Sequence, residues 1–70
     1  MIRLSKSQEK VCNLAAKGLS DKEIAYALNI SESTVNLHLW EAKKKFNVKN
    51  RTKLALKYLE DRGLIKYTTA

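Results

Sequence analysis

Apolar residues recur along the chain at intervals of three and four positions, the spacing of one face of a helix. Four such stretches, separated by short polar segments, predict helices over about 6–17, 21–28, 32–46 and 51–62. No segment shows the alternation of apolar and polar residues that is typical of a β-strand. The expected fold class is therefore all-α, with four helices in one domain over residues 1–70.

Helix-starting and helix-ending residues bracket these stretches. Each stretch follows a residue that can cap a helix, and in the first two a Gln or Glu three positions later completes the spacing of a capping box: Ser5 with Gln8, Ser20 with Glu23, then Ser31 and Asn50. Gly18 and Gly63 supply the left-handed residue that ends the first and fourth helices. After Gly63 we expect Leu64 and Ile65 to fold back onto the core and residues 66–70 to fray.

A short second helix, a turn of about three residues and a longer third helix form the helix-turn-helix arrangement. Ala25 lies where the two helices would pass close together, and its small side chain suits close packing. Ile30, in the turn, is expected to drop into the core between them. Val48, in the loop after the third helix, is expected to point inward as well.

The third predicted helix has two contrasting sides. Its core-facing stripe is made by Val35, Leu39, Ala42 and Phe46. The opposite side carries Ser33, Asn36, Leu37, Trp40, Lys44 and Asn47. A solvated face gives no reason to display a Leu beside the only Trp of the chain, so this side is predicted to meet a partner, and the major groove of DNA fits it.

The charge of the chain is strongly positive. Fourteen Lys and Arg residues against seven Asp and Glu leave a net charge of +7. This density favours an anionic partner, either nucleic acid or an acidic membrane surface, and a soluble protein that is merely basic is the alternative. Six basic residues lie between Lys43 and Lys53 with no acid among them. Because the sequence shows neither a membrane span nor the apolar core of a signal peptide, a cytoplasmic protein without membrane contact is expected.

Residues for catalysis or metal binding are sparse. One His and one Cys cannot build a metal site, and a single Cys excludes an internal disulfide. Cys12 lies in an apolar run and is expected to be a buried or half-buried hydrophobe. The sequence has no Gly-rich phosphate loop and no Ser and His with a plausible orienting acid. Neither an enzyme nor a cofactor-binding protein is expected.

Several short motifs resemble those of the LuxR/FixJ/GerE-type DNA-binding domain, in register and without a gap from about Leu4 to Ile65: Gly-Leu-Ser at 18–20, Lys-Glu-Ile-Ala at 22–25, Thr-Val at 34–35 with His38, and Asn-Arg-Thr at 50–52. The resemblance implies a four-helix domain of the winged-helix-like DNA-binding superfamily, in a bacterial or phage transcription regulator. Most members carry it behind a receiver or ligand-binding domain, for which this chain has no room. Both a free-standing GerE-like regulator and an excised output domain remain open.

Three residues are candidates for contacts with bases. The resemblance implies that the two positions after Thr-Val, and the one four residues after the first of them, face bases: Asn36, Leu37 and Trp40. Asn36 can pair bidentately with adenine, and Leu37 can contact a thymine methyl. Trp40 departs from the family pattern, in which polar or basic residues are more usual. It either packs on sugars and thymine methyls or binds a protein, and an exposed face with stray hydrophobes is the plain alternative.

Phosphate contacts should form the larger group. The candidates lie at the start of the second helix and at both ends of the third: Lys22, Ser33, Thr34, His38, Lys44, Lys49, Asn50 and Arg51. For His38 the resemblance suggests a phosphate contact, and a half-buried His bonded locally is equally plausible. Glu41 is expected on the outer face, where it would repel phosphate unless it accepted from a cytosine amine.

The fourth helix offers a second candidate surface. Leu56 points roughly 130° away from the centre of the core face of that helix and is expected to be exposed. The family uses this helix for dimerisation, which favours a weak homodimer on a two-fold site with Lys53, Leu56 and Glu60 at the seam. A stray surface Leu is nearly as plausible.

Two other functions compete with a sequence-specific transcription regulator bound to double-stranded DNA. A region-4-like sigma fragment shares the first three helices, but the Asn-Arg-Thr segment at 50–52 and the fourth helix weigh against it. A protein-binding helix-turn-helix module would instead dock a regulator or RNA polymerase through Leu37 and Trp40.

Overall fold

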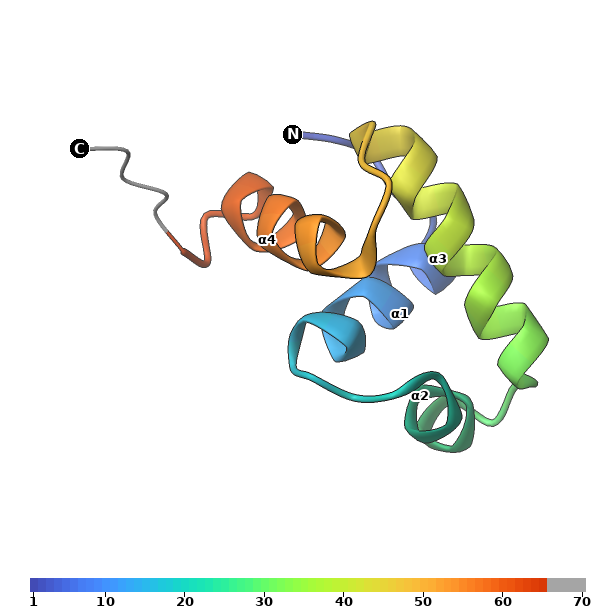
Figure 1. The fold of residues 1–70 in the computed structure, drawn as a ribbon. Coiled ribbons are helices and arrows are strands. Elements are labelled where there is room, and N and C mark those ends of the chain that lie inside the picture. Colours follow the sequence, from blue (N-terminus) through green and yellow to red (C-terminus); the bar gives the residue numbers. More distant parts are fainter. Residues whose placement is uncertain (66–70) are drawn as a thin grey trace.

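The computed structural model of the chain describes residues 1–65 (Figure 1) and contains four helices, α1 (Lys6–Ala16), α2 (Asp21–Leu28), α3 (Glu32–Phe46) and α4 (Arg51–Asp61). All four predicted helices are confirmed, and the described residues contain no strand, in agreement with the all-α prediction. Helices α1 and α4 end one residue earlier than expected, because Lys17 and Arg62 are the residues at which each helix unwinds. The fraying predicted for 66–70 lies outside the described residues.

Side chains fix the start of every helix, as predicted. The Ser5 hydroxyl accepts from the Gln8 amide at 3.1 Å, and the Gln8 side chain accepts from the Ser5 amide at 3.1 Å. Ser20 and Glu23 form the same capping box, with distances of 3.2 and 2.8 Å. The bond from the Ser20 amide lowers the pKa of Glu23. The other two caps accept a single amide each, Ser31 from Thr34 at 3.1 Å and Asn50 from Lys53 at 2.8 Å.

Every helix also ends in the same way. A residue in the left-handed region is followed by an apolar residue, whose amide donates to the carbonyl five positions back. The four pairs and their distances are Gly18-Leu19 (3.2 Å), Asn29-Ile30 (3.0 Å), Asn47-Val48 (3.0 Å) and Gly63-Leu64 (2.9 Å). Asn29 and Asn47 both have φ of 56°, and Asn is the residue other than Gly that adopts this conformation most readily. The sequence predicted the two glycine ends but not the left-handed conformation of the two asparagines.

The apolar residues of these ends differ in where they pack. Ile30 and Val48 are partly buried against the core, as predicted. Leu64 is 62% exposed, so the prediction that it folds back onto the core is wrong. The end of α4 lies on the side of the fold away from α3 (Figure 1), and Tyr58 is the last fully buried side chain of that helix. The Leu64 amide still closes the helix, while its side chain stays in solvent and the next residue, Ile65, is half-buried.

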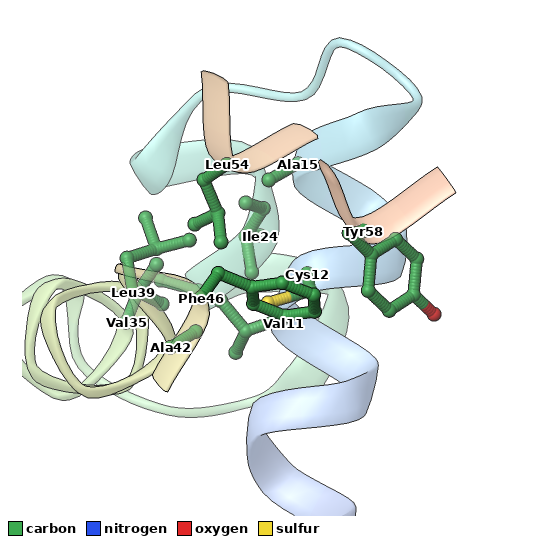
Figure 2. Close-up of a cluster of buried hydrophobic side chains, with 11 residues drawn as sticks. Val11, Cys12, Ala15, Ile24, Val35, Leu39, Ala42, Phe46, Leu54 and Tyr58 are labelled. Atoms are coloured by element: carbon green, nitrogen blue, oxygen red, sulfur yellow. The ribbon is translucent and has the colours of Figure 1, made fainter. Parts of the chain in front are cut away.

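The core lies where the four helices meet. Helix α1 packs against both α3 and α4, and α2 packs against α3. Figure 2 shows the buried side chains converging from all four helices, and the predicted stripe of α3 is buried throughout. The cluster consists of Val11, Cys12, Ala15, Ile24, Ala25, Val35, Leu39, Ala42, Phe46, Leu54 and Tyr58. Burial raises the pKa of the Cys12 thiol to about 11, so this residue serves as a small hydrophobe, as expected.

A polar network ties α1 to α4 at the edge of the core. The Tyr58 hydroxyl donates to Glu9 at 2.6 Å, and the Arg62 guanidinium donates to both oxygens of the same carboxylate at 2.7 and 3.1 Å. The hydrogen bonds from Arg62 and Tyr58 lower the pKa of Glu9. Burial, and then the bond to Glu9, raises the pKa of Tyr58 to about 12. The phenol therefore stays protonated and keeps donating throughout the neutral range.

Replacing Tyr58 with Phe should lower the free energy of unfolding by about 1–2 kcal/mol near neutral pH, because a hydrogen bond to a carboxylate is lost. The pKa of Tyr58 is raised by folding from an ordinary value of 10 to about 12. The advantage of the native chain over the variant is thus complete below pH 10 and fades as the pH rises through about 12. Urea unfolding of both proteins from about pH 9 to about pH 11.5 measures this difference. Tyr26→Phe, at a side chain that is 90% exposed, is the matched control.

Candidate nucleic-acid interface

The three predicted base-contacting residues lie together on the outer face of α3. Asn36 is exposed, while Leu37 and Trp40 are 50% and 53% exposed. They stand opposite the buried stripe, with Leu37 and Trp40 about one helical turn apart. Because a helix rises 1.5 Å per residue, the face from Asn36 to Trp40 is about 6 Å long, close to two base-pair steps. A face of this length fits contacts with two or three neighbouring base pairs.

Hydroxyl groups gather at the start of α3. The Ser31 hydroxyl lies 3.2 Å from that of Ser33 and 2.8 Å from that of Thr34, while it caps the Thr34 amide. Ser33 is exposed and Thr34 is half-buried. The free amides and the helix dipole at this end favour an anion. Lys22 is exposed in the first turn of α2, so a second helix start carries a cation.

The far end of α3 is basic. The Lys44 ammonium stands 4.3 Å from the centre of the Trp40 ring, a cation–π pair between residues four apart on the outer face. Lys49 and Asn50 are exposed in the segment that leads into α4. The side-chain oxygen of Asn50 accepts from the Lys53 amide and caps α4. The side-chain NH₂ of Asn50 remains able to donate. This end therefore presents cations and donors, the groups that bind phosphate.

Glu41 does not lie on the outer face, and that prediction is wrong. Its carboxylate accepts from the Gln8 side chain at 3.2 Å and lies 3.4 Å from Nδ1 of His38. The Gln8 side chain is buried, and its oxygen also accepts from Lys45 at 2.7 Å. A single residue of α1 thus holds two residues of α3. His38 is half-buried and hydrogen-bonded to Glu41 within α3. This is the local bond that the sequence analysis gave as the alternative to a phosphate contact.

Arg51 also has partners within the chain. Its guanidinium forms an ion pair with Asp21 and donates to the Leu19 carbonyl oxygen at 2.5 Å. These bonds join the first turn of α4 to the first turn of α2, which are 30 residues apart in sequence. The structure therefore places Arg51 beside the other phosphate candidates but occupies its guanidinium with a link between two helices.

The predicted dimer residues come together on α4. Lys53, Leu56 and Glu60 line a shallow groove with Val48 and Lys57. Leu56 is half-buried, so the prediction of an exposed side chain is wrong. Helical periodicity takes account only of residues within α4. Val48, from the preceding loop, lines the same groove as Leu56.

The sequence analysis missed two features of this surface and its support, at Tyr26 and Gln8. Tyr26 on α2 is 90% exposed, the most exposed aromatic side chain of the described residues. The sequence predicted that Gln8 caps α1, but not that its side chain bonds Glu41 and Lys45 of α3. Its surplus hydrogen-bonding capacity, together with Glu41 and Lys45 four residues apart on α3, was the available signal.

Other kinds of site find little support in the part of the chain that the structure describes. Within residues 1–65, no three His, Cys, Asp or Glu side chains gather into a group that could hold a metal ion. Over the same residues, no helix has the length and apolar content needed to cross a membrane.

Comparison with known proteins gives a consistent family. The model of "Bacterial regulatory proteins, luxR family" matches residues 3–58. The nitrate/nitrite response regulator protein NarP of Escherichia coli is 40% identical over 60 residues, which are 86% of this chain and 28% of NarP. The quorum-sensing regulator RhlR of Pseudomonas aeruginosa is 45% identical over 62 residues, 89% of this chain and 25% of RhlR. The chain spans about a quarter of the length of these curated relatives.

The fold agrees with the sequence comparison. The solved structure of the transcription factor GerE superimposes with a TM-score of 0.76 and 28% sequence identity, over 90% of this chain and 92% of that one. The match therefore includes nearly all of both chains. The chain belongs to the luxR family of bacterial regulatory proteins, and its four helices form the helix-turn-helix domain of that family.

Proposed function

We propose that the chain is a sequence-specific DNA-binding unit of a transcription regulator and that α3 enters the major groove. The observation that carries this proposal is the outer face of α3, where an exposed Asn36 adjoins two exposed apolar side chains and the Lys44 cation. The net charge of +7 supports an anionic partner. Family membership supports a regulator, and neither the family nor the site suggests catalysis.

In this proposal Asn36, Leu37 and Trp40 contact bases. The phosphate contacts come from three exposed lysines, two hydroxyls and one amide around them, of which only Thr34 is half-buried: Lys22, Lys44, Lys49, Ser33, Thr34 and Asn50. His38 and Arg51 would have to give up Glu41 and Asp21 to bind phosphate. We therefore assign these two residues to positioning, His38 for α3 and Arg51 for the starts of α2 and α4.

The groove on α4 supports a second part of the proposal, a weak homodimer. Lys53 and Glu60 have opposite charges and flank Leu56 in the same groove, so a two-fold axis would pair each Lys53 with the partner's Glu60. Exposed pairs of this kind are worth about 0–1 kcal/mol each, which suits an assembly that forms on DNA rather than in its absence.

One alternative function has an observation in its favour. Leu37 and Trp40 are both about half exposed, and such side chains also serve as anchors in protein interfaces. The chain would then be a module that docks a regulator or RNA polymerase. A chain that binds DNA through α3 could also contact RNA polymerase. Tyr26, exposed on α2, is then a candidate anchor for the polymerase.

The deciding experiment titrates the purified 70-residue chain against a random-sequence duplex pool at two salt concentrations and sequences the retained DNA. A short enriched motif, repeated with two-fold symmetry, is expected. Three lysines on phosphates predict that log K falls with log salt with a slope of about −3 per bound copy. Binding without enrichment would remove sequence specificity from the proposal. No binding at moderate salt would overturn the proposal in favour of the protein-docking alternative.

Lys49→Ala should weaken binding to all sequences alike and reduce the magnitude of the salt slope by about 1, because one phosphate contact is lost. Fluorescence anisotropy on the enriched duplex and on a scrambled duplex, over a series of salt concentrations, measures both effects. Arg3→Ala removes the same charge beside Glu9 and Arg62, away from the candidate interface, and should leave the slope unchanged. A loss confined to the enriched duplex would contradict the assignment of Lys49 to phosphate.

A further inference from the structure

The centre of the candidate interface is apolar. Leu37 and Trp40 are half exposed, and they lie three residues apart on the outer face of α3. Leu37 has no hydrogen-bonding group, and Trp40 has a single indole N–H. The free energy that these two side chains can gain from a partner therefore comes mainly from contact with apolar atoms.

The surroundings of this apolar pair select a polyanion. Helix α3 carries two acids. Glu32 is exposed in its first turn, five residues before Leu37, and Gln8 and His38 hold Glu41 on the side of α3 that faces α1. Lys44 stands over the Trp40 ring, so a cation lies directly beside the apolar centre. A face of this charge complements DNA, and it would repel a basic protein surface.

The edges of the base pairs in the major groove expose a single apolar group, the C5-methyl of thymine. We propose that the DNA half-site carries thymines opposite Leu37 and Trp40, and that these side chains recognise them by their methyl groups. The inference depends on the proposed function and names the sequence class that α3 prefers. Three residues of helix span about 4.5 Å, slightly more than one base-pair step, so the two thymines belong to neighbouring or next-neighbouring pairs. Asn36 sets the adenine position at the edge of this run.

The polar contacts of the interface cannot supply this preference. The hydroxyls and lysines around α3 address phosphates, which are the same in every sequence. Asn36 reads a single base. Without the apolar pair, the domain would distinguish one position per half-site, and the remaining major-groove positions under α3 would be unread. Leu37 and Trp40 are therefore the specificity-determining residues for those positions.

The test starts from the duplex enriched in the selection experiment. Each thymine in the half-site is replaced in turn by deoxyuridine, which removes the methyl and keeps every hydrogen-bonding group. Replacing either thymine opposite Leu37 or Trp40 should lower the affinity of the protein for the duplex about three- to fivefold, which corresponds to the burial of one methyl group. Cytosine and 5-methylcytosine are then compared at the same positions, opposite guanine, and the methylated base should bind about three- to fivefold more tightly.

Matched variants assign the effect to side chains. Leu37→Ala should abolish the response to one methyl and Trp40→Ala the response to the other, because the apolar contact atoms are gone. Lys49→Ala should keep both responses while it weakens binding overall. Circular dichroism of each variant checks that the exposed substitutions leave the helices intact.

The outcomes separate this inference from the proposed function. An enriched motif whose affinity is indifferent to every thymine methyl overturns the inference and leaves the proposed function standing. Methyl responses that persist in both Ala variants also overturn it. Failure to bind any duplex overturns both the proposed function and this inference. Leu37 and Trp40 would then be assigned to contact with a protein partner.

Discussion

Replacing Phe46 with Ala is expected to lower the free energy of unfolding by about 3–5 kcal/mol. Phe46 is 6% exposed at the end of α3 and lies with Val11 and Cys12 of α1 in the same buried cluster (Figure 2). The truncation removes apolar contacts and leaves a cavity at the junction of α1, α3 and α4. A domain of this length has a total stability of only about 4–10 kcal/mol, so the variant should be partly unfolded at physiological temperature.

Thermal and urea unfolding followed by circular dichroism measure this effect. Leu37→Ala is the matched control, since it removes a large side chain from the exposed side of the same helix and should change the stability by no more than about 0.5 kcal/mol. Phe46→Leu, which fills most of the space, should fall between the two. Equal stability of the Phe46→Ala and Leu37→Ala variants would contradict the position of Phe46 in the core.

Asn36→Ala is expected to reduce affinity for the enriched duplex by about 1–3 kcal/mol and to relax the preference at one base pair. The physical reason is that only an amide offers the donor and acceptor pair that matches adenine in the major groove. Asn36 is exposed on the outer face of α3, so its removal should leave the fold unchanged. Anisotropy titrations against the enriched duplex, and against duplexes with each other base at the adenine position, measure both effects.

Asn47→Ser is a suitable comparison for Asn36→Ala, because it removes an amide at the far end of the same helix. It acts on the left-handed residue that ends α3, so it should affect stability more than base preference. Unchanged affinity together with unchanged preference in Asn36→Ala would refute the base contact. A uniform loss over all duplexes would indicate that Asn36 contacts phosphate.

Most of the fold could be predicted from sequence because its determinants are local. The capping boxes of Ser5 with Gln8 and of Ser20 with Glu23 form within four residues, and periodicity within α3 distinguishes the stripe around Leu39 from the outer face. The same periodicity placed the three base candidates on the outer face, while the family resemblance selected them as base contacts. Their exposure together on one face follows from the helix alone.

Two long polar side chains have partners far along the chain that the sequence did not reveal. Glu41 meets Gln8 across 33 residues, and Arg51 meets Asp21 across 30 residues. Periodicity assigns a residue to a face of its own helix, but it does not show which neighbouring helix offers a partner for a long polar side chain. For this reason the predicted phosphate contact of Arg51 must compete with an ion pair that the sequence did not reveal.

The local nature of the helix boundaries has a consequence for the speed of folding. Each helix carries its own start signal and its own left-handed end, so no segment depends on a distant strand or helix to define its limits. Helical chains dominated by such near-neighbour contacts belong to the fast class, which folds in about microseconds to milliseconds. A domain of this kind can complete its fold soon after it leaves the ribosome, whatever else the same polypeptide contains.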